Sequence, residues 1–279
     1  MPDTTSSPSL SSMFLRRSLM SVAGGWILGG LETVHDLGAF LLITVSVIVT
    51  KFNTARALVH PMIRAQIARA GLKLLPMVTF LACALGLVVI GQTVLLLNRY
   101  GAPKYLGMVM VSVVVRELGP LLAALLVLAR IGTANVVELG TARALGEVEA
   151  LEALAIDPIH FLVAPRVIGM ALAIFSLTVY LILFALLSGY AFAFLQNVPL
   201  TPSEYFDQLA LSLMWQDFVL LALKTLSFGV LIATVTCYEG LAKPVRLERV
   251  SSATARAVGE CVVGVVMLDA LFMIVYLVI

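Results

Sequence analysis

The chain has 279 residues, of which 61% are hydrophobic and 12% are charged, and its mean hydropathy is +1.06. A soluble domain is about half apolar and about a quarter charged, so this composition excludes an ordinary water-soluble protein and indicates several membrane crossings. The formal net charge of +2 gives no sign of a nucleic-acid partner.

The beginning of the chain combines a polar stretch with an apolar one. Residues 1–12 are rich in serine and threonine, and we expect a disordered polar tail. Arg16 and Arg17 precede an apolar stretch, as in a signal peptide, but glycine pairs interrupt it and no small-residue cleavage site closes it. We therefore expect residues 14–34 to form a helix on the membrane surface of the mature protein.

A short apolar run at residues 37–49 leads into a basic amphipathic segment at residues 51–73. The run has the length of an interfacial or re-entrant segment rather than of a span. The basic segment has five lysines and arginines and no acid, which predicts contact with anionic headgroups on the cytoplasmic side. Residues 13–73 are thus predicted to form an N-terminal interfacial region.

Residues 74–279 contain five apolar runs, each long enough for the roughly 20 residues that a span requires. Lysine and arginine gather before the first run, between the second and third, and between the fourth and fifth, which places these segments and the N-terminus in the cytoplasm and the C-terminus outside. The predicted fold class is an all-α polytopic membrane protein with an N-terminal interfacial helix and five transmembrane helices. The predicted spans are residues 74–97, 105–129, 163–195, 217–238 and 257–279.

Four ionisable residues lie inside these spans, where a charge costs from about 2.5 to well over 10 kcal/mol. Their signs sum to zero, as expected for paired charges. They are either buried ion pairs that fix the helix register or a polar site that receives a charged group of a substrate. Neighbouring helix positions point about 100° apart, so the adjacent pair needs at least one partner from another helix or a polar cavity. The four are Arg116 and Glu117 in span two, Lys224 in span four and Asp269 in span five.

Gly119 and Pro120 follow the adjacent charged pair. Proline removes a backbone donor and clashes with the preceding turn, so these residues predict a bend in span two. A bend makes a cavity near the charges easier to form, although a kink that serves packing alone explains the two residues equally well.

A second informative segment lies between spans two and three, at about residues 138–157. Apolar residues recur at every third position, which predicts one apolar helix face. Five acids accompany one arginine, which is unusual on a side where basic segments are the rule. The segment is therefore either a solvated surface helix or a docking helix for a cytoplasmic partner. Its charged residues are Glu138, Arg143, Glu147, Glu149, Glu152 and Asp157.

The sequence offers little for catalysis. It holds no G-x-x-x-x-G-K-[ST] motif, so we expect no ATP bound in the P-loop manner, and neither G-x-S-x-G nor H-E-x-x-H occurs. The three cysteines are scattered through apolar runs and the three histidines stand alone, which argues against a metal site. We expect no cofactor on this chain.

The stretches RELGPLLAALLVLARIGTANVVELG and EVEALEALAIDPIHFLVAPRV, with CYEGL, SSATARAV and VVMLDALF further on, resemble the hallmark region of the MlaE/YrbE permease family. This resemblance covers roughly residues 35–279. Members of the family are the membrane subunits of MCE-type lipid ABC transporters in the bacterial inner membrane, and such systems serve outer-membrane lipid asymmetry. The charged residues of the family motifs correspond to Arg116, Glu117, Lys224 and Asp269.

The resemblance implies an MlaE-like fold and a homodimer that holds phospholipid in an outward-facing cavity between its subunits. It implies a cytoplasmic ATPase, which carries ATP and magnesium and docks on residues 138–157. A periplasmic hexamer of MCE-domain proteins is the other main partner, and a STAS-domain subunit is a further candidate. The expected function is ATP-driven movement of phospholipids or related lipids between the inner membrane and the MCE partner.

Three rival functions fit the residues less well. A proton- or ion-coupled secondary transporter would show inverted repeats, and we find none in the sequence. A membrane-embedded enzyme would need a nucleophile beside a base. A scaffold for a membrane complex gives no reason for four charges inside the spans.

Overall fold

The computed structural model describes residues 35–48, 50, 56–101, 105–195, 202–241 and 247–278. These residues are almost entirely helical, and no strand occurs among them. Five helices are long and apolar enough to cross a membrane, and a shorter apolar helix, His35–Ile48, precedes them. The predicted fold class is thereby confirmed. The polar tail and surface helix that we expected at residues 1–34 lie outside the described residues.

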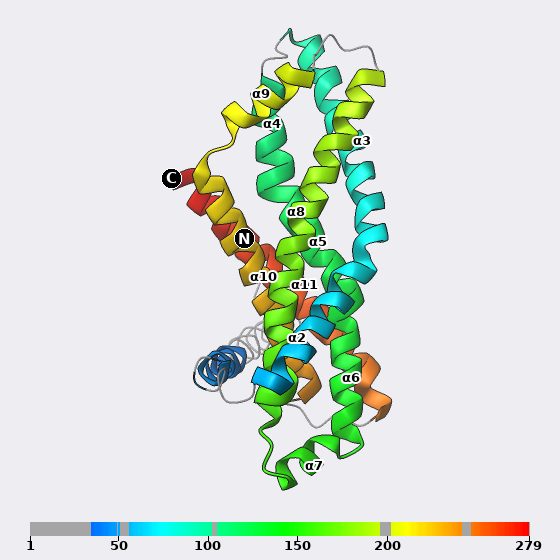
Figure 1. Ribbon diagram of the computed structural model, residues 1–279, viewed down its shortest axis with the longest axis vertical. Helices are drawn as coiled ribbons and strands as arrows, with labels where there is room; N and C mark the ends of the chain where they lie inside the picture. Colours follow the sequence, from blue (N-terminus) through cyan, green and yellow to red (C-terminus); the bar gives the residue numbers. More distant parts are fainter. Residues whose placement is uncertain are drawn as a thin grey trace, which may run out of the picture.

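The described helices follow one another along the chain (Figure 1). The first span combines the end of α2 with α3, and the second joins α4, α5 and α6 through two π-helical stretches. The helices are α2 (Arg56–Ala70), α3 (Leu75–Arg99), α4 (Leu106–Met110), α5 (Gly119–Val127), α6 (Thr133–Ala144), α7 (Glu147–Ala153), α8 (Ala164–Leu195), α9 (Pro202–Ser212), α10 (Trp215–Leu241) and α11 (Val250–Val278). The π-helical stretches are Val111–Leu118, Leu128–Gly132 and Ile159–Val163, and 3₁₀ turns lie at Leu72–Leu74 and Leu247–Arg249.

α8 forms the centre of the bundle, where α2, α3, α5 and α10 pack against it. Two glycines permit the closest approaches. A Cβ added at Gly86 of α3 would lie 2.2 Å from the Ala185 carbonyl oxygen, and one at Gly229 of α10 would lie 2.3 Å from the Ala171 Cα atom. Small residues at helix contacts are the usual means by which membrane helices approach closely. The spans around α8 are therefore packed backbone against backbone.

The two ends of the bundle differ. α9 and α4 lie side by side at one end, and α7 lies at the other (Figure 1). Tyr205 and Leu209 of α9 are buried, and the Tyr205 hydroxyl donates to the Leu186 carbonyl oxygen over 3.3 Å. This burial raises the pKa of the Tyr205 phenol. α9 is thus a packed cap that leads directly into α10.

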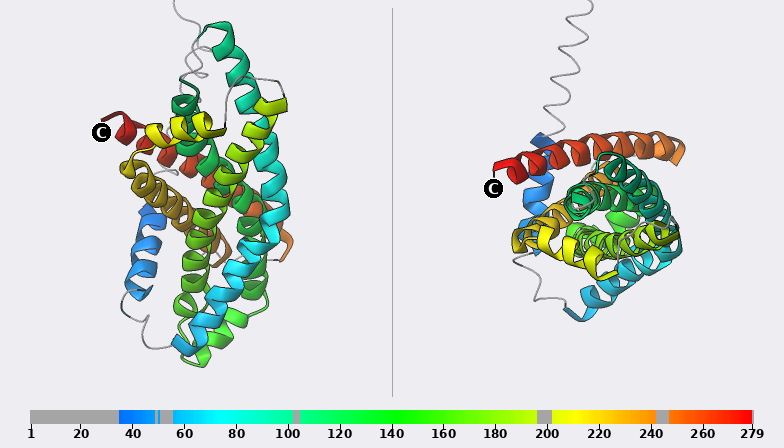
Figure 2. Two further views of the ribbon diagram at one scale, coloured as in Figure 1. Left: turned by 45° about the horizontal axis from the view of Figure 1, so that its top comes forward. Right: turned by 90° about the horizontal axis from the view of Figure 1, so that it is seen from above.

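α11 lies along the outside of the bundle (Figure 2). It contacts α10 and α6, but most of its apolar side chains stay exposed, Val263, Met267 and Leu277 among them. An apolar helix face without protein cover suits a membrane or another apolar protein surface. α11 is the least enclosed of the five spans.

Candidate functional site

Glu117 and Asp269, two of the charged residues predicted from the sequence, both contact a third, Lys224. Its side chain is 0% exposed, and its Nζ atom lies 2.7 Å from Asp269 Oδ1 and 3.1 Å from Glu117 Oε2. The site thus joins span two, span four (α10) and span five (α11). A buried ammonium in apolar surroundings needs such partners, because an unpaired charge there is very costly.

Lys224 also satisfies a backbone group that Pro120 leaves without its usual donor. In an α-helix the amide of residue 120 would donate to the carbonyl of Arg116, but proline has no N–H. The Lys224 ammonium donates to that carbonyl oxygen over 2.9 Å. The preceding stretch, Val111–Leu118, is π-helical, and the Gly119 amide donates to the Val114 oxygen. Such π-helical turns occur frequently at functional sites.

Arg116 pairs with Asp217, a residue that the sequence analysis did not single out. The Arg116 Nε atom lies 2.9 Å from Asp217 Oδ1, and Nη2 donates to Oδ2 over 3.3 Å. The Met214 amide donates to the same Oδ2 over 2.9 Å, and the Asp217 side chain is only 4% exposed. Asp217 precedes Lys224 by seven residues, so both lie on one face of α10. That spacing was the signal available in the sequence.

Asp217 changes the charge count of the cluster. The sequence placed two bases and two acids inside the spans, whereas the structure brings together two bases and three acids. The four charges identified from the sequence sum to zero, but with Asp217 the fully ionised cluster carries one negative charge in excess. The count failed because Asp217 stands at the very start of a predicted span, where an acid is ordinary at a helix N-terminus.

Tyr276 is the second residue that the sequence analysis missed. Its ring centroid lies 5.3 Å from the Arg116 Cζ atom and 6.0 Å from the Lys224 Nζ atom. Cations within about 6 Å of an aromatic ring are attracted to its face. Tyr276 follows Asp269 by seven residues, so α11 presents an acid and an aromatic ring on one face.

The members of the cluster differ in how far they are exposed. The side chains of Arg116 and Glu117 are 29% and 30% exposed, whereas those of Lys224 and Asp217 are 0% and 4% exposed. An incoming polar group therefore meets the guanidinium of Arg116 and the carboxylate of Glu117 first. The buried members hold the two in place, since each has a partner on α10.

The acidic segment that we expected to be one docking helix is divided in two. α6 ends at Ala144, Gly146 has φ +79°, and α7 begins at Glu147. Glycine adopts this left-handed conformation without strain because it carries no Cβ, and a residue in that conformation commonly ends a helix. α6 is continuous with span two, so only α7 is a separate surface helix.

The charged residues of that segment have different roles. Glu138 accepts hydrogen bonds from Arg69 at 2.9 Å and from Arg166 at 3.0 Å, and Arg143 donates to the Leu241 carbonyl oxygen. These contacts lie within the chain. The three acids of α7, Glu147, Glu149 and Glu152, are exposed. Asp157, the last acid of the segment, accepts a hydrogen bond from the Ile159 amide.

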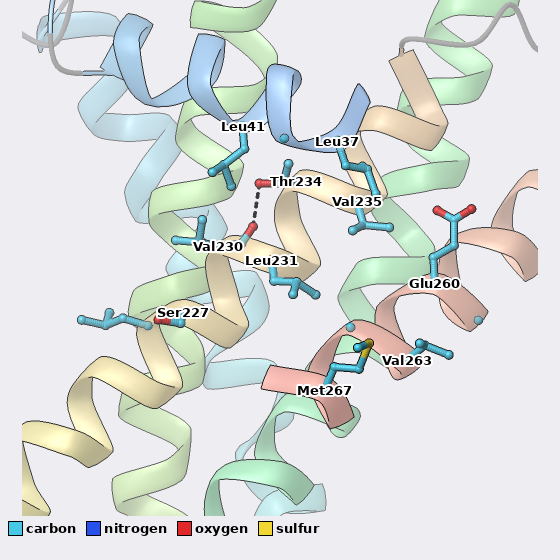
Figure 3. A pocket seen from close by; sticks show the side chains of 14 residues that line it. Leu37, Leu41, Ser227, Val230, Leu231, Thr234, Val235, Glu260, Val263 and Met267 are labelled. Atoms are coloured by element: carbon cyan, nitrogen blue, oxygen red, sulfur yellow. Dashed lines mark hydrogen bonds between the residues drawn. The ribbon is translucent and has the colours of Figure 1, made fainter. Parts of the chain in front are cut away.

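An apolar cavity of about 930 Å³ lies between the His35–Ile48 helix, α10 and α11. Figure 3 shows Leu37 and Leu41 pointing toward α10 from the first helix, with Met267 of α11 on another side and the carboxylate of Glu260 at the margin. Its lining is almost wholly hydrocarbon, so the chemistry it suits is that of an acyl chain.

Comparison with known proteins agrees with these features. The family described as "Permease MlaE" matches residues 63–275. A probable ABC transporter permease protein of Rickettsia prowazekii is 30% identical over 193 residues, which cover 69% of this chain and 74% of that protein. A probable ABC transporter permease protein of Synechocystis is 34% identical over 164 residues, or 57% of this chain and 60% of that protein.

A plant protein is also similar. Protein TRIGALACTOSYLDIACYLGLYCEROL 1, chloroplastic, of Arabidopsis thaliana is 29% identical over 209 residues, which cover 73% of this chain and 58% of that protein. The family match extends over most of the described structure, from α2 through α11, and includes every residue of the charged cluster except Tyr276. The chain therefore belongs to the MlaE permease family and is the membrane-spanning permease subunit of a transporter.

Proposed function

We propose that this permease moves phospholipids or related lipids between the bacterial inner membrane and a periplasmic MCE-domain partner, driven by ATP hydrolysis on a separate cytoplasmic subunit. The observation that carries the proposal is the charged cluster within the spans, of which Arg116 and Glu117 are the most exposed members. A lipid has a charged headgroup and apolar chains, and the chain offers both surfaces. The name of the Arabidopsis relative refers to a glycolipid, which supports a lipid cargo.

In this proposal Arg116 is the group that meets the headgroup phosphate. Its guanidinium is held by Asp217 and lies over the Tyr276 ring, yet it is 29% exposed. Guanidinium groups suit phosphate oxygens because they offer several donors in one plane. Lys224 has a different part, since its ammonium is fully buried between two carboxylates. It secures the helices and does not touch the lipid.

The proposed active form is a homodimer joined through α11. Val263, Val266 and Met267 are 60%, 52% and 69% exposed, and they form part of an apolar face that a second copy would cover. The lipid would lie between the two copies, open to the periplasm and to the MCE hexamer. A STAS-domain subunit is a further proposed cytoplasmic partner.

The proposed docking element for the ATPase is α7 with the turns on either side. Its acids Glu147, Glu149 and Glu152 are exposed, and Leu145 and Leu154 beside it are 62% and 71% exposed. Exposed leucines between acids suit an apolar groove with a basic rim on a partner. ATP and magnesium would be bound by that partner.

The docking element is tested by co-purification of the chain with its ATPase. Reversal of the three α7 acids to lysine should abolish the complex, whereas Glu248→Lys, an exposed acid in the turn before α11, should leave it intact. A complex that survives the triple reversal would remove α7 from the interface.

The lipid role is tested in proteoliposomes that hold the permease, its ATPase and its MCE partner. Arg116→Gln should lower ATP-dependent lipid movement at least tenfold, because one charge-assisted contact is lost. Arg99→Gln, an exposed arginine of α3, is the matched control. Normal lipid movement by an Arg116→Gln protein that remains a stable dimer would refute the role of Arg116 in transport.

A further inference from the structure

A small second pocket lies between α2 and the start of α8, away from the charged cluster. Figures 1 and 2 show α2 crossing α8, and the two helices are in extensive contact. The pocket has a volume of about 120 Å³ and receives Gln66 and Arg69 from α2 and Arg166 from α8. This volume accommodates a small polar group and is too small for an acyl chain.

The pocket carries an excess of positive charge. Arg69 and Arg166 both bind the carboxylate of Glu138, at 2.9 and 3.0 Å, so one charge of the two is balanced. Arg166 also donates to the Leu162 carbonyl oxygen over 3.2 Å. Within the described part of the chain, these contacts leave other N–H groups of both guanidiniums without a protein acceptor and free to bind water or an anion, since each guanidinium has five. The pocket therefore attracts an anion.

Gln66 supplies an independent observation. Its side chain is 5% exposed, yet its Nε2 atom has no hydrogen-bond partner among the described residues. A buried amide N–H without an acceptor is costly, so such a group normally has a ligand or water beside it. The stem of Gln66 is fixed against α8, because a Cβ added at Gly169 would come within 2.7 Å of Gln66 Cγ. The residue with the unpaired donor thus lines the same pocket as the two arginines.

We propose that this pocket binds the phosphate of an anionic phospholipid in the leaflet next to α2. Two guanidiniums and an amide N–H are donors suited to phosphate oxygens. Basic pockets between transmembrane helices bind anionic headgroups, and this pocket is lined by α2, a basic helix that enters the first span. The acyl chains remain outside, against the apolar surface. This site is separate from the cargo site and does not depend on which molecule the transporter moves.

The test is a lipid titration of the purified full-length chain in detergent, read by native mass spectrometry. Apart from any lipid at the proposed cargo site, which the Arg116→Gln chain is used to weaken, phosphatidylglycerol should bind at one tight site that diacylglycerol, which lacks phosphate, does not fill. Gln66→Met keeps the side-chain volume and should weaken that tight binding about tenfold, the loss of one hydrogen bond to a charged group. Gln92→Met, an exposed glutamine of α3, is the matched control and should bind as the unaltered chain does.

Two further arms make the result decisive. Arg166→Lys keeps the charge but loses the planar fork of donors, and it should also weaken binding several-fold even if Gln66→Met proves unstable. Inorganic phosphate should displace the lipid only at far higher concentration than the lipid itself requires. Equal affinity for phosphatidylglycerol in the Gln66→Met, Arg166→Lys and Gln92→Met proteins would overturn the proposal. If inorganic phosphate competed at the same concentration as the lipid, the ligand of this pocket would be free phosphate and not a lipid headgroup.

Discussion

Replacing Lys224 with methionine tests whether the charged cluster holds the bundle together. The change keeps an unbranched side chain of similar length but removes the ammonium that lies 2.7 Å from Asp269 and 3.1 Å from Glu117. It also removes the donor to the Arg116 carbonyl oxygen, which Pro120 cannot replace. Two carboxylates and one carbonyl then lose a partner in a single substitution.

The magnitude follows from how deeply each partner is buried. Breaking a buried ion pair by removing one member costs about 3–5 kcal/mol. The two carboxylates are 30% and 18% exposed, so water reaches both in part, and we expect the lower end of this range, about 3 kcal/mol. For a chain of this size the melting temperature should fall by roughly 6–12 °C.

The assay is thermal unfolding in detergent, followed by the loss of the monodisperse peak in size-exclusion chromatography. Lys73→Met makes the same replacement at an exposed lysine and should change stability by less than about 0.5 kcal/mol. The double variant Lys224→Met/Asp269→Leu should recover part of the loss, because it removes the Lys224–Asp269 pair as a unit and leaves only Glu117 and the carbonyl without their partner. If the Lys224→Met and Lys73→Met proteins have the same melting temperature, the cluster does not stabilise the fold as we argue.

Three other predictions concern packing, thiol access and orientation. Gly229→Ala should lower the free energy of unfolding by about 1–3 kcal/mol through overpacking against α8. At Gly259 an added Cβ meets no atom within 4 Å among the described residues, so Gly259→Ala should be neutral or slightly stabilising. Both are measured by thermal unfolding. In detergent, a small membrane-permeant maleimide should label Cys83, which faces outward from the first span, and the two buried cysteines only after denaturation; equal labelling of all three would contradict the packing. In a cysteine-free chain, Leu154→Cys should react from the cytoplasmic side and Leu211→Cys from the periplasmic side of intact cells, and the reverse pattern would invert the topology.

The number of spans could be predicted because it depends on length and hydropathy alone. Each of the five runs must bury its backbone polar groups within a helix to cross a bilayer, and local sequence decides that. The four charges were found for the same reason, since an ionisable residue in an apolar run is conspicuous. The structure places Arg116, Glu117, Lys224 and Asp269 in one cluster.

The features that the sequence analysis missed depend on contacts between distant parts of the chain. Asp217 looks like an ordinary acid at a helix start until Arg116, 101 residues away, is seen beside it. Glu138 looked like a surface acid of a docking helix, but its partners come from α2 and α8. The local sequence pattern predicts which face of a helix is apolar and which is polar, but not which neighbouring helix each face contacts. Gly146, in contrast, carried a local signal for the break before α7, because glycine is the usual residue at a left-handed helix end.

The bond from Lys224 to the Arg116 carbonyl has a consequence for how span two can move. Here a backbone carbonyl of span two accepts its hydrogen bond from a side chain of α10. If α10 withdraws, that carbonyl is left without its donor at a cost of about 1–3 kcal/mol, and the turn before Pro120 loses a restraint on its curvature. Bending of span two and departure of α10 are therefore coupled by about that free energy, so movement of one helix favours movement of the other.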